Sequence, residues 1–390
     1  MIEETAIKIL NSGYVCDSCL GRQFAKLLRG YSNQERGKII RDFLAMECEA
    51  KKIKADPANF EKGKKREKCM VCENLFDNLS KISDKILKTL KPMDFETCLV
   101  GVKMSDSLVM NEEALWERTG VKYSEPIKSE IGRELGKMLA EKAGRRVDPS
   151  KPDILIIFDV QKGGTEIFSN SLFVYGEYKK FVRGLPQTKS PRYKKTIQDV
   201  IAKPFMRFTS ASSNVLHALG REDKEAKCLA WRPFVLELKQ PMKRRIDFKR
   251  VKKEINMRKE VKVRRLRISD KKEVSLLKSK RPYKVYRVVV DFERKVEKVG
   301  NVRKLVGVVR QGTARRVLPS KPDKIKDKKI KSIKWKRINN KRYRFEIKTE
   351  SGLYLKELVS GDSGRTNPSF SKVLGNKAKV REFDLIGLEG

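Results

Sequence analysis

The sequence predicts an α+β protein whose 390 residues form two or three domains. Apolar residues at helical spacing dominate the N-terminal part, and apolar or alternating runs typical of strands dominate the C-terminal part. Residues 185–193, with two prolines and polar spacers, read as a linker between the two parts. Hydrophobic residues make up 39% of the chain, which argues for packed cores and against wholesale disorder.

The helices are predicted from apolar residues that recur every three or four positions. In residues 126–141 this pattern runs from Ile127 to Leu139 and describes one face of a helix. Residues 193–203 form another candidate, which we expect to end at Pro204. The predicted helices cover residues 2–12, 21–29, 33–48, 73–90, 126–141, 193–203, 248–256 and 270–279, with one more beginning near 354.

The strands are predicted from short apolar runs and from alternation. Residues 153–159 form an unbroken apolar run, and 166–175 follow as a partner strand after two glycines. The basic, aromatic-poor stretches 310–316 and 321–337 are predicted to be loops. The predicted strands cover residues 98–103, 153–159, 166–175, 234–248, 261–268, 284–291 and 343–349.

Two Cys-x-x-Cys pairs predict a structural metal site. Cys16 and Cys19 form the first pair and Cys69 and Cys72 the second, with 49 residues between the pairs. A two-residue gap lets both sulfurs of a pair reach one ion, and four thiolates are a tetrahedral zinc set. A redox motif would need a thioredoxin-like strand before the pair, which neither pair has. Four sulfur ligands leave no open position, so we expect one zinc that holds the fold.

The charge of the chain predicts a polyanionic partner. Lys and Arg number 91 against 50 acidic residues, a net charge of +41. Thermophilic surface charge is an alternative, but balanced ion-pair networks would add acids as well. Residues 241–280 alone hold 17 basic and 5 acidic residues, which favours a surface that follows phosphates. We therefore expect a protein that binds nucleic acid.

Other features exclude whole classes of protein. The chain has no apolar run of 18 residues and no signal-peptide pattern at its start, so we expect a cytoplasmic protein with reduced cysteines. His217 is its one histidine, which excludes mechanisms that need two imidazoles and disfavours a Ser-His-Asp triad.

The loop before the strand at 234 is the candidate for chemistry. It contains Gly220-Arg221-Glu222-Asp223 and leads into Arg232-Pro233-Phe234. Charged residues on a loop that is anchored by a buried strand are typical of a functional site. On spacing alone, a solvated turn is the favoured interpretation of the loop.

The loop resembles the G-R-x-D loop of the pseudouridine synthases, and the wider pattern is closest to the branch called Pus-ten. After Asp223 the chain departs from the family pattern, with Glu225 and Lys227 in place of a second aspartate and an arginine. The other motifs in family order are the two Cys-x-x-Cys pairs, Leu185-Pro-Gln-Thr188, Arg232-Pro-Phe234, Lys284-x-Tyr286, Gly352-Leu-Tyr-Leu-Lys356 and 361–368.

The resemblance implies a domain order. Residues 1–75 would form a zinc-binding N-terminal region, and 76–186 a THUMP-like tRNA-binding domain. Residues 187–390 would form a pseudouridine synthase catalytic domain, with a bisected antiparallel sheet and the active site between its halves. Aromatic and basic residues at 175–183 suit RNA stacking and phosphate contact, although core packing explains the aromatics equally well.

The resemblance also implies the site residues. Asp223 would act as nucleophile or base, and Lys356 would pair with it and lower its pKa. Tyr286 would stack on the extruded uracil and serve in proton transfer, and Tyr354 would line the pocket beside it. Arg221 would hold the flipped-out nucleotide.

The activity implied is isomerisation of uridine 54, uridine 55 or both in the T arm of tRNA. The reaction needs no catalytic cofactor and no small-molecule cosubstrate, and we expect a monomer. A non-catalytic tRNA-binding or tRNA-chaperone protein is the alternative. A THUMP-linked methyltransferase or thiouridine synthase would need a glycine-rich nucleotide loop, and Gly163-Gly164 and Gly361-x-x-Gly364 lack its spacing.

Overall fold

The computed structural model describes residues 2–50, 68–189, 191 and 193–389. They divide into two compact units, residues 1–170 and residues 171–390. Part of the predicted zinc-binding region, residues 51–67, lies outside the described residues. Across the described ranges, none of the helices has the length and apolar character needed to cross a membrane.

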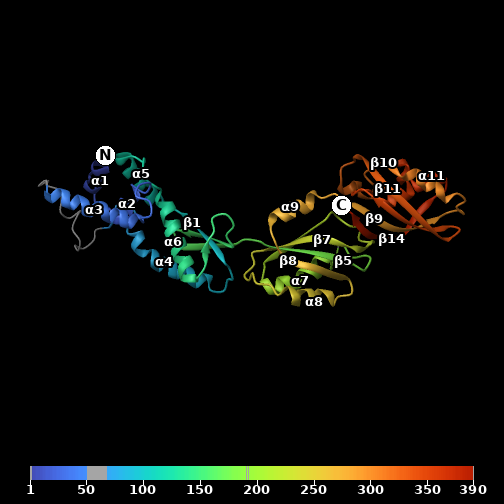
Figure 1. The fold of residues 1–390 in the computed structure, drawn as a ribbon, viewed down its shortest axis with the longest axis horizontal. Coiled ribbons are helices and arrows are strands. Elements are labelled where there is room, and N and C mark those ends of the chain that lie inside the picture. Colours follow the sequence, from blue (N-terminus) through green and yellow to red (C-terminus); the bar gives the residue numbers. More distant parts are fainter. Residues whose placement is uncertain (1, 51–67, 190, 192, 390) are drawn as a thin grey trace. The chain divides into compact units, whose positions relative to one another are not determined.

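The first unit combines helices with a four-stranded sheet of order β2-β1-β3-β4 (Figure 1). β1 is parallel to β2 and β3, and β3 is antiparallel to β4. The helices are α1 (Ile2–Asn11), α2 (Asp17–Arg22), α3 (Asn33–Ala50), α4 (Leu75–Leu90), α5 (Asp106–Thr119) and α6 (Ile127–Ala143). The strands are β1 (Thr97–Lys103), β2 (Arg146–Val147), β3 (Ile154–Asp159) and β4 (Gly164–Ser169).

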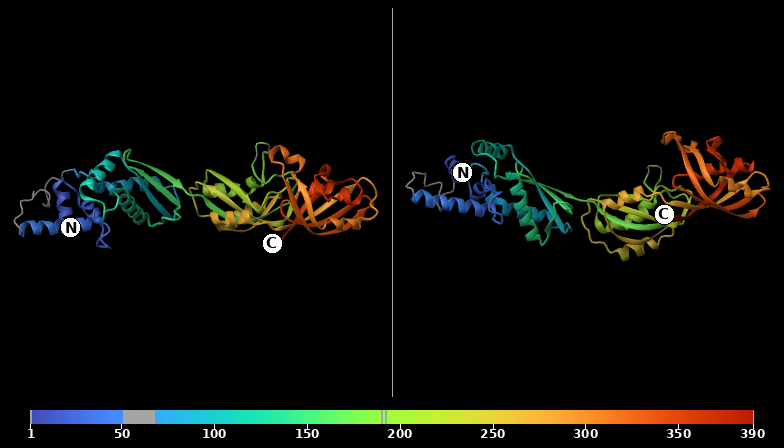
Figure 2. Two further views of the ribbon diagram at one scale, coloured as in Figure 1. Left: turned by 90° about the horizontal axis from the view of Figure 1, so that it is seen from above. Right: turned by 45° about the horizontal axis from the view of Figure 1, so that its top comes forward.

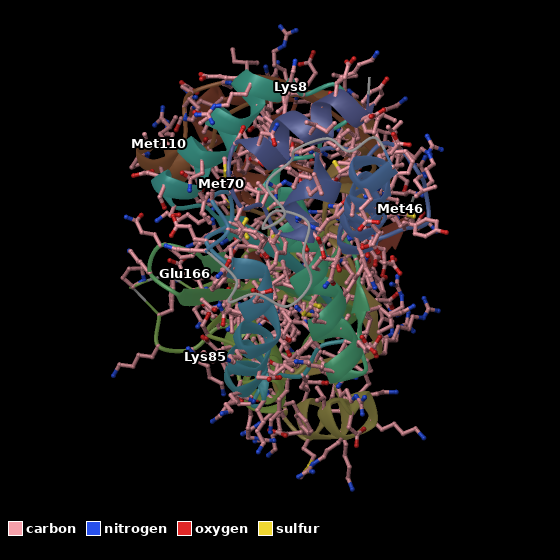
Figure 3. All side chains as sticks on the ribbon, turned by 90° about the vertical axis from the view of Figure 1, so that its left-hand side faces the viewer. Lys8, Met46, Met70, Lys85, Met110 and Glu166 are labelled. Atoms are coloured by element: carbon pink, nitrogen blue, oxygen red, sulfur yellow. The ribbon has the colours of Figure 1, made fainter. Side chains whose placement is uncertain are left out.

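One hydrophobic core holds the first unit together. Ile86 of α4 and Leu135 of α6 pack with Val100 of β1 and Ile156 of β3, so both helices cover the same face of the sheet. The cysteine pairs belong to this core as well. Met46 of α3 and Met110 of α5, labelled in Figure 3, lie on the outside with exposures of 63% and 68%.

The second unit is built on a ten-stranded mixed sheet. Its order is β13-β10-β11-β12-β9-β14-β7-β5-β8, with β6 paired to β7. Only two residue pairs join β14 to β7, and this junction is parallel whereas the other pairs of the sheet are antiparallel. The strands are β5 (Leu172–Lys180), β6 (Ser213–Ala218), β7 (Lys227–Lys239), β8 (Val261–Ser269), β9 (Tyr283–Phe292), β10 (Gly307–Gly312), β11 (Ile325–Asn339), β12 (Arg342–Thr349), β13 (Thr366–Asn367) and β14 (Ala378–Glu389).

Separate cores lie on the two sides of the β14–β7 junction. On one side, β5, β6, β7 and β8 pack against α7 (Ile197–Thr209) and α8 (Phe248–Asn256), while α9 (Lys271–Ser279) packs on the opposite face (Figure 1, Figure 2). On the other side, β9 to β12 and β14 pack against η2 (Val299–Leu305), α10 (Leu355–Ser360) and α11 (Phe370–Leu374). We call the part of the sheet from β9 to β14, with the helices packed on it, the C-terminal lobe. It also contains the short helices η3 (Arg315–Ser320) and η4 (Asp362–Gly364).

The structure differs from the predicted strands in three places. The strand predicted at 234–248 is β7, which begins at Lys227 and ends at Lys239, because Gln240 has a φ of +48° and leaves the extended conformation. Residues 166–175 form β4 and β5, which pair with strands of different units. The first unit therefore ends before 186, and residues 171–186 lie in the second unit. The predicted basic loops within 310–337 contain β10, η3 and β11. In β11 the lysines alternate with the inward-facing Ile333 and Trp335, and the high charge concealed this alternation.

Two predicted helices also differ. α2 ends at Arg22, because the N–H groups of residues 23–25 donate to carbonyls three residues back and the α-helical pattern stops. α7 continues through Pro204 to Thr209. Ile201 and Phe205 are fully buried on either side of this proline, and their packing outweighs the lost backbone hydrogen bond. α5, β6 and β14 were not predicted at all.

Candidate active site and metal centre

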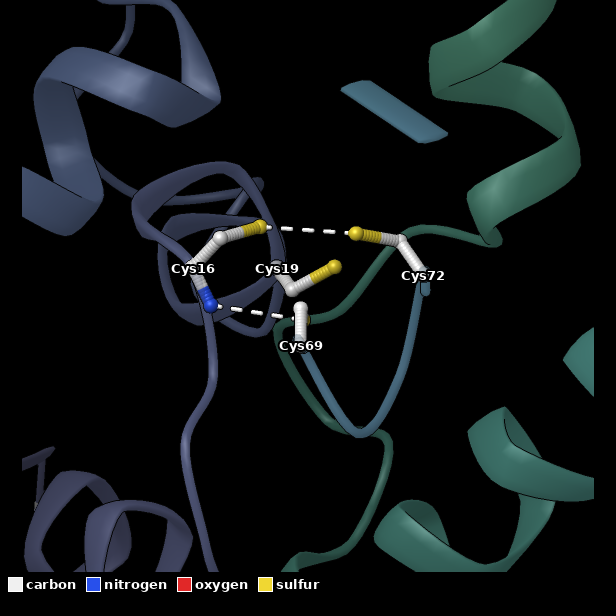
Figure 4. Close-up of side chains that lie close together, drawn as sticks. All are labelled: Cys16, Cys19, Cys69 and Cys72. Atoms are coloured by element: carbon white, nitrogen blue, oxygen red, sulfur yellow. Dashed lines mark hydrogen bonds between the residues drawn. The ribbon is translucent and has the colours of Figure 1, made fainter. Parts of the chain in front are cut away.

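The four cysteines of the two pairs meet in the first unit (Figure 4). Their sulfurs all lie within 4.8 Å of one another, and the Sγ atoms of Cys16 and Cys72 are 3.6 Å apart. A tetrahedral zinc with bonds of about 2.3 Å separates its sulfurs by about 3.8 Å, so the cluster fits such an ion. The backbone N–H of Cys16 donates to Cys69 Sγ at 3.3 Å, a bond that stabilises a thiolate.

A buried arginine, Arg22, contacts one sulfur of the cysteine cluster. The Arg22 guanidinium is fully buried and donates to Cys19 Sγ at 3.7 Å. The nitrogen that makes this contact, Nη1, also lies 3.6 Å from Glu130 Oε2, and Nη2 lies 3.3 Å from Glu112 Oε1. Burial raises the pKa of Glu130 to about 7, although Arg22 acts in the opposite direction. α2, α5 and α6 are thus joined beside the cysteine cluster.

The candidate catalytic loop connects β6 to β7 in the second unit. It turns at Gly220, whose φ of +68° favours glycine. Arg232 on β7 is fully buried and donates from Nε and Nη2 to the carbonyl of Leu219, at 3.1 and 2.7 Å. Its Nη1 donates to Glu222 Oε2 at 3.0 Å. Arg232 therefore holds the loop at two points on the N-terminal side of Asp223.

A second buried cation holds the other side of the loop. Lys180, at the end of β5, is fully buried. Its ammonium donates to the backbone carbonyls of Asp223 at 3.3 Å and Lys224 at 3.1 Å. It also lies 3.7 Å from Glu222 Oε1. The backbone of the loop is consequently fixed on both sides of the Asp223 side chain.

The Asp223 carboxylate lies between cations. Its Oδ2 is 3.2 Å from Lys356 Nζ and 3.9 Å from Arg316 Nη1, and its Oδ1 accepts the N–H of Glu225 at 3.0 Å. Burial raises the pKa of Asp223, but the Glu225 N–H, Lys356 and Arg316 lower it more, so the net pKa is below the ordinary value. The Asp223 side chain is 20% exposed to solvent, so a ligand can reach this ionised carboxylate.

The cationic side of the site is itself fixed by buried partners. Arg316 of η3 donates from Nε to the buried Glu357 Oε1 at 2.7 Å. Its guanidinium also lies 6.0 Å from the centre of the Tyr354 ring. The backbone of Tyr354 exchanges two hydrogen bonds with the buried side chain of Gln311, at 2.7 and 3.0 Å. The start of α10, with Lys356, is thus held against β10.

Tyr286 approaches the same cluster from β9. Its ring packs against Phe383 at a centroid distance of 6.4 Å, and the Lys356 ammonium lies 5.4 Å from that Phe383 ring. Burial raises the pKa of Tyr286 to about 12, with Arg232 acting in the opposite direction and Asp223 adding to the rise. Lys284, two residues earlier on the same face, is buried, and burial together with the charge of Arg232 lowers its pKa to about 8.

The structure therefore brings together Asp223, Lys356, Tyr286 and Tyr354, but not every candidate. Arg221 is exposed, and among the described residues no ion pair or hydrogen bond joins it to this cluster. His217 contacts Glu237 at 2.9 Å, away from Asp223.

Sequence reasoning missed several residues that build the site. Lys180 could have been found, because alternation along β5 places it on the same face as the buried Val174 and Tyr178. Arg316 carries no local signal, since its partners Asp223 and Glu357 lie far away in the chain. The residues missed are Lys180, Gln311, Arg316 and Glu357.

Comparison with protein families defines the class of the two units. Residues 82–159 match the model described as "Pus10 THUMP domain, archaeal". Residues 173–389, nearly all of the second unit, match the model described as "Pus10, C-terminal". The chain thus joins an archaeal-type THUMP domain to the C-terminal domain of a pseudouridine synthase family.

The chain belongs to the Pus10 family. It is 35% identical to the tRNA pseudouridine synthase Pus10 of Pyrococcus furiosus, over 99% of this chain and 97% of that protein. The enzyme of the same name from Methanothrix thermoacetophila is 33% identical over 99% of this chain and 94% of that protein. A solved Cbf5-Nop10-Gar1 complex contains a chain that is 14% identical, with a TM-score of 0.33 over 54% of this chain and 48% of that chain.

Proposed function

We propose that this tRNA pseudouridine synthase isomerises uridine 54, uridine 55 or both in the T arm of tRNA, with Asp223 as its essential nucleophile or base. The observation that carries the proposal is the ionised Asp223 carboxylate, 3.2 Å from Lys356 on a loop fixed from both sides. The relatives that share nearly the whole chain are named tRNA pseudouridine synthases.

The reaction moves a bond and a proton within one nucleotide. The glycosidic bond between N1 of uracil and C1′ of ribose breaks, the base turns, and C5 joins C1′. The proton on C5 is lost and N1 gains one, so no electrons enter or leave. An ionised Asp223 can attack C1′ or add to the uracil ring, and both routes need a carboxylate that is not protonated at neutral pH.

The remaining residues prepare this carboxylate and hold the base. Lys356, with Arg316 behind it, keeps Asp223 ionised. Tyr286 stacks on the uracil and relays a proton, and Tyr354 lines the pocket. Arg221, which is exposed in the free protein, contacts the extruded nucleotide when RNA is bound.

The two units divide the work. The first unit, with one zinc held by Cys16, Cys19, Cys69 and Cys72, docks the tRNA. The zinc holds the fold and supplies no catalytic chemistry, because four thiolates complete its coordination. The second unit is the catalytic domain, and the separate cores beside the β14–β7 junction support the interpretation of its sheet as bisected. The enzyme acts as a monomer in the cytoplasm.

The test is carbodiimide primer-extension mapping of an unmodified tRNA transcript treated with wild type or Asp223→Ala. We expect T-arm pseudouridine from wild type and a loss of more than about a thousandfold in the variant, with tRNA affinity retained. Glu225→Gln is the matched control, since this neighbouring carboxylate is 47% exposed and should be dispensable. Tight tRNA binding with no pseudouridine from any protein would indicate a non-catalytic binder instead.

A further inference from the structure

The sheet of the C-terminal lobe has one packed face and one open face. The packed face carries apolar side chains such as Ile333, Phe345 and Val288, which meet η2, α10 and α11. Side chains alternate along a strand, so their neighbours point the other way. We call this second surface the outer face. Its cations include Arg287 on β9, Lys329, Lys334 and Lys336 on β11, and Arg342, Arg344 and Lys348 on β12. The acids Glu346 and Asp291 lie among them, and Asp291 pairs with Arg342.

The pairing register places these cations next to one another. Lys336 lies opposite Arg344, and Lys334 lies opposite Glu346, which in turn lies opposite Arg287. Neighbouring strands are about 4.8 Å apart and alternate residues about 6.8 Å, so the cations form a two-dimensional array. On its edge, Tyr283 lies beneath Lys331 and Lys348, at 4.7 and 5.8 Å from its ring centre.

The acids near the outer face do not neutralise it. Glu346 pairs with Arg287 at 3.1 Å, and Glu389 pairs with Lys348. Within the described part of the chain, no hydrogen bond or ion pair engages the charged ends of the remaining outer-face cations, which are Lys329, Lys334, Lys336 and Arg344. Four unneutralised cations on the two adjacent strands β11 and β12 repel one another, an arrangement that a polyanion relieves.

The outer face also lies on the opposite side of the sheet from the reacting carboxylate. Tyr286 pairs with Ile347 on the packed face, and α10, which carries Lys356, packs on that face as well. The RNA arm that reaches Asp223 therefore approaches the packed side. A second contact on the outer face requires another part of the RNA.

We propose that the outer face binds the sugar–phosphate backbone of an RNA helix, in a part of the tRNA outside the reacting T arm. This inference rests on the proposed tRNA substrate. Cationic side chains on an open surface contact phosphates, and such contacts do not depend on the base sequence of the RNA. None of the four unneutralised cations lines the pocket formed by residues 291–292 and 339–342 at the ends of β9 and β12, and an open array of single cations suits a long polyanion better than a small anion.

The test uses the full-length chain with Lys334→Gln, Lys336→Gln and Arg344→Gln combined. For unmodified full-length tRNA we expect Kd to rise about tenfold or more, and the slope of log Kd against log salt to fall by about 2 to 3. For a T-arm minihelix, Kd should stay within about twofold. The pseudouridine rate at saturating tRNA should not change, because these residues are remote from Asp223.

The matched control removes three exposed lysines from the packed side of the same lobe, with Lys295→Gln, Lys298→Gln and Lys304→Gln. The reacting arm approaches the packed side, so the control variant is also measured on the minihelix. If both triple variants weaken binding of full-length tRNA equally and both spare the minihelix, net charge alone explains the effect and the proposal fails. An equal loss for tRNA and minihelix would also overturn it, since the contact would then lie in the reacting arm. Single substitutions of Lys334 and Lys336 serve if the triple variant melts early. A protein that binds tRNA as expected but makes no pseudouridine would refute only the proposed function.

Discussion

The cysteine cluster and the Asp223 site share one feature, a buried arginine next to the key residues, but differ in the partners that those residues face. Each has a fully buried arginine behind it, Arg22 in the first unit and Arg232 in the second, and each arginine is paired with buried glutamate. The cysteines close around one point with four like ligands. Asp223 instead faces unlike partners, Lys356 and Arg316, and remains partly exposed.

This difference separates structural from chemical sites. Four thiolates that coordinate one ion leave no open position for a substrate, so removing one of these thiolates should destabilise the fold. A partly exposed carboxylate with a lowered pKa can still contact a substrate, so removing it should lower the reaction rate and not the stability of the fold. The predictions below test this contrast, and the largest effect comes first.

Loss of a metal ligand should loosen the first unit and spare the second. In Cys69→Ser, or after chelation, we expect faster hydrogen exchange in α1, α2 and α3 and weaker tRNA binding, because structural zinc contributes on the order of 10 kcal/mol in small zinc domains. Exchange in β5 to β14 should not change. Cys48→Ser, outside the cluster, is the control. A metal-free protein with full tRNA affinity would contradict the structural role.

Breaking the buried ion pair under the catalytic loop should cost stability in the second unit. Glu222→Gln leaves Arg232 and Lys180 buried without a counter-charge, which costs about 3 to 5 kcal/mol and lowers the melting temperature by about 10 °C. Calorimetry of the full chain measures this. In the double variant Glu222→Leu/Arg232→Met part of the loss should return, and an unchanged melting temperature in the single variant would show that the pair is dispensable.

Removing the cation next to Asp223 should change its pKa rather than the fold. Burial raises the pKa of Asp223, and Lys356 is among the groups that lower it, so Lys356→Met should raise this pKa. The acid limb of the rate profile should move to higher pH by about 1 to 3 units, because a close opposite charge is removed. Because the pKa of Asp223 is lower in the folded state, ionisation of Asp223 stabilises the fold at pH values above the unfolded-state pKa. This stabilisation is lost as pH falls through the folded-state pKa, and Lys356→Met should make it smaller.

The control for this prediction is Lys356→Arg, which keeps the charge and should keep most of the activity. A rate profile of Lys356→Met that drops evenly at every pH would mean that Lys356 acts by contacting the substrate and not through the pKa of Asp223.

The sequence alone determined the features whose causes are local. Apolar spacing placed α6, β3 and β9 within a residue or two, because the period of a helix or strand depends on neighbours in the chain. The paired cysteines and the motif around Asp223 predicted two groups of residues that the structure brings together, since these residue types carry their chemistry wherever the fold places them.

Only the tertiary structure decided which distant residues complete the sites and where the units divide. The strand predicted at 166–175 belongs to two sheets, and no local pattern shows which partner each half chooses. Arg316 meets Asp223 across 93 residues, and Lys180 meets the loop across 43. Such contacts depend on how burial and charge are satisfied throughout the unit, and a single stretch of sequence contains none of that information.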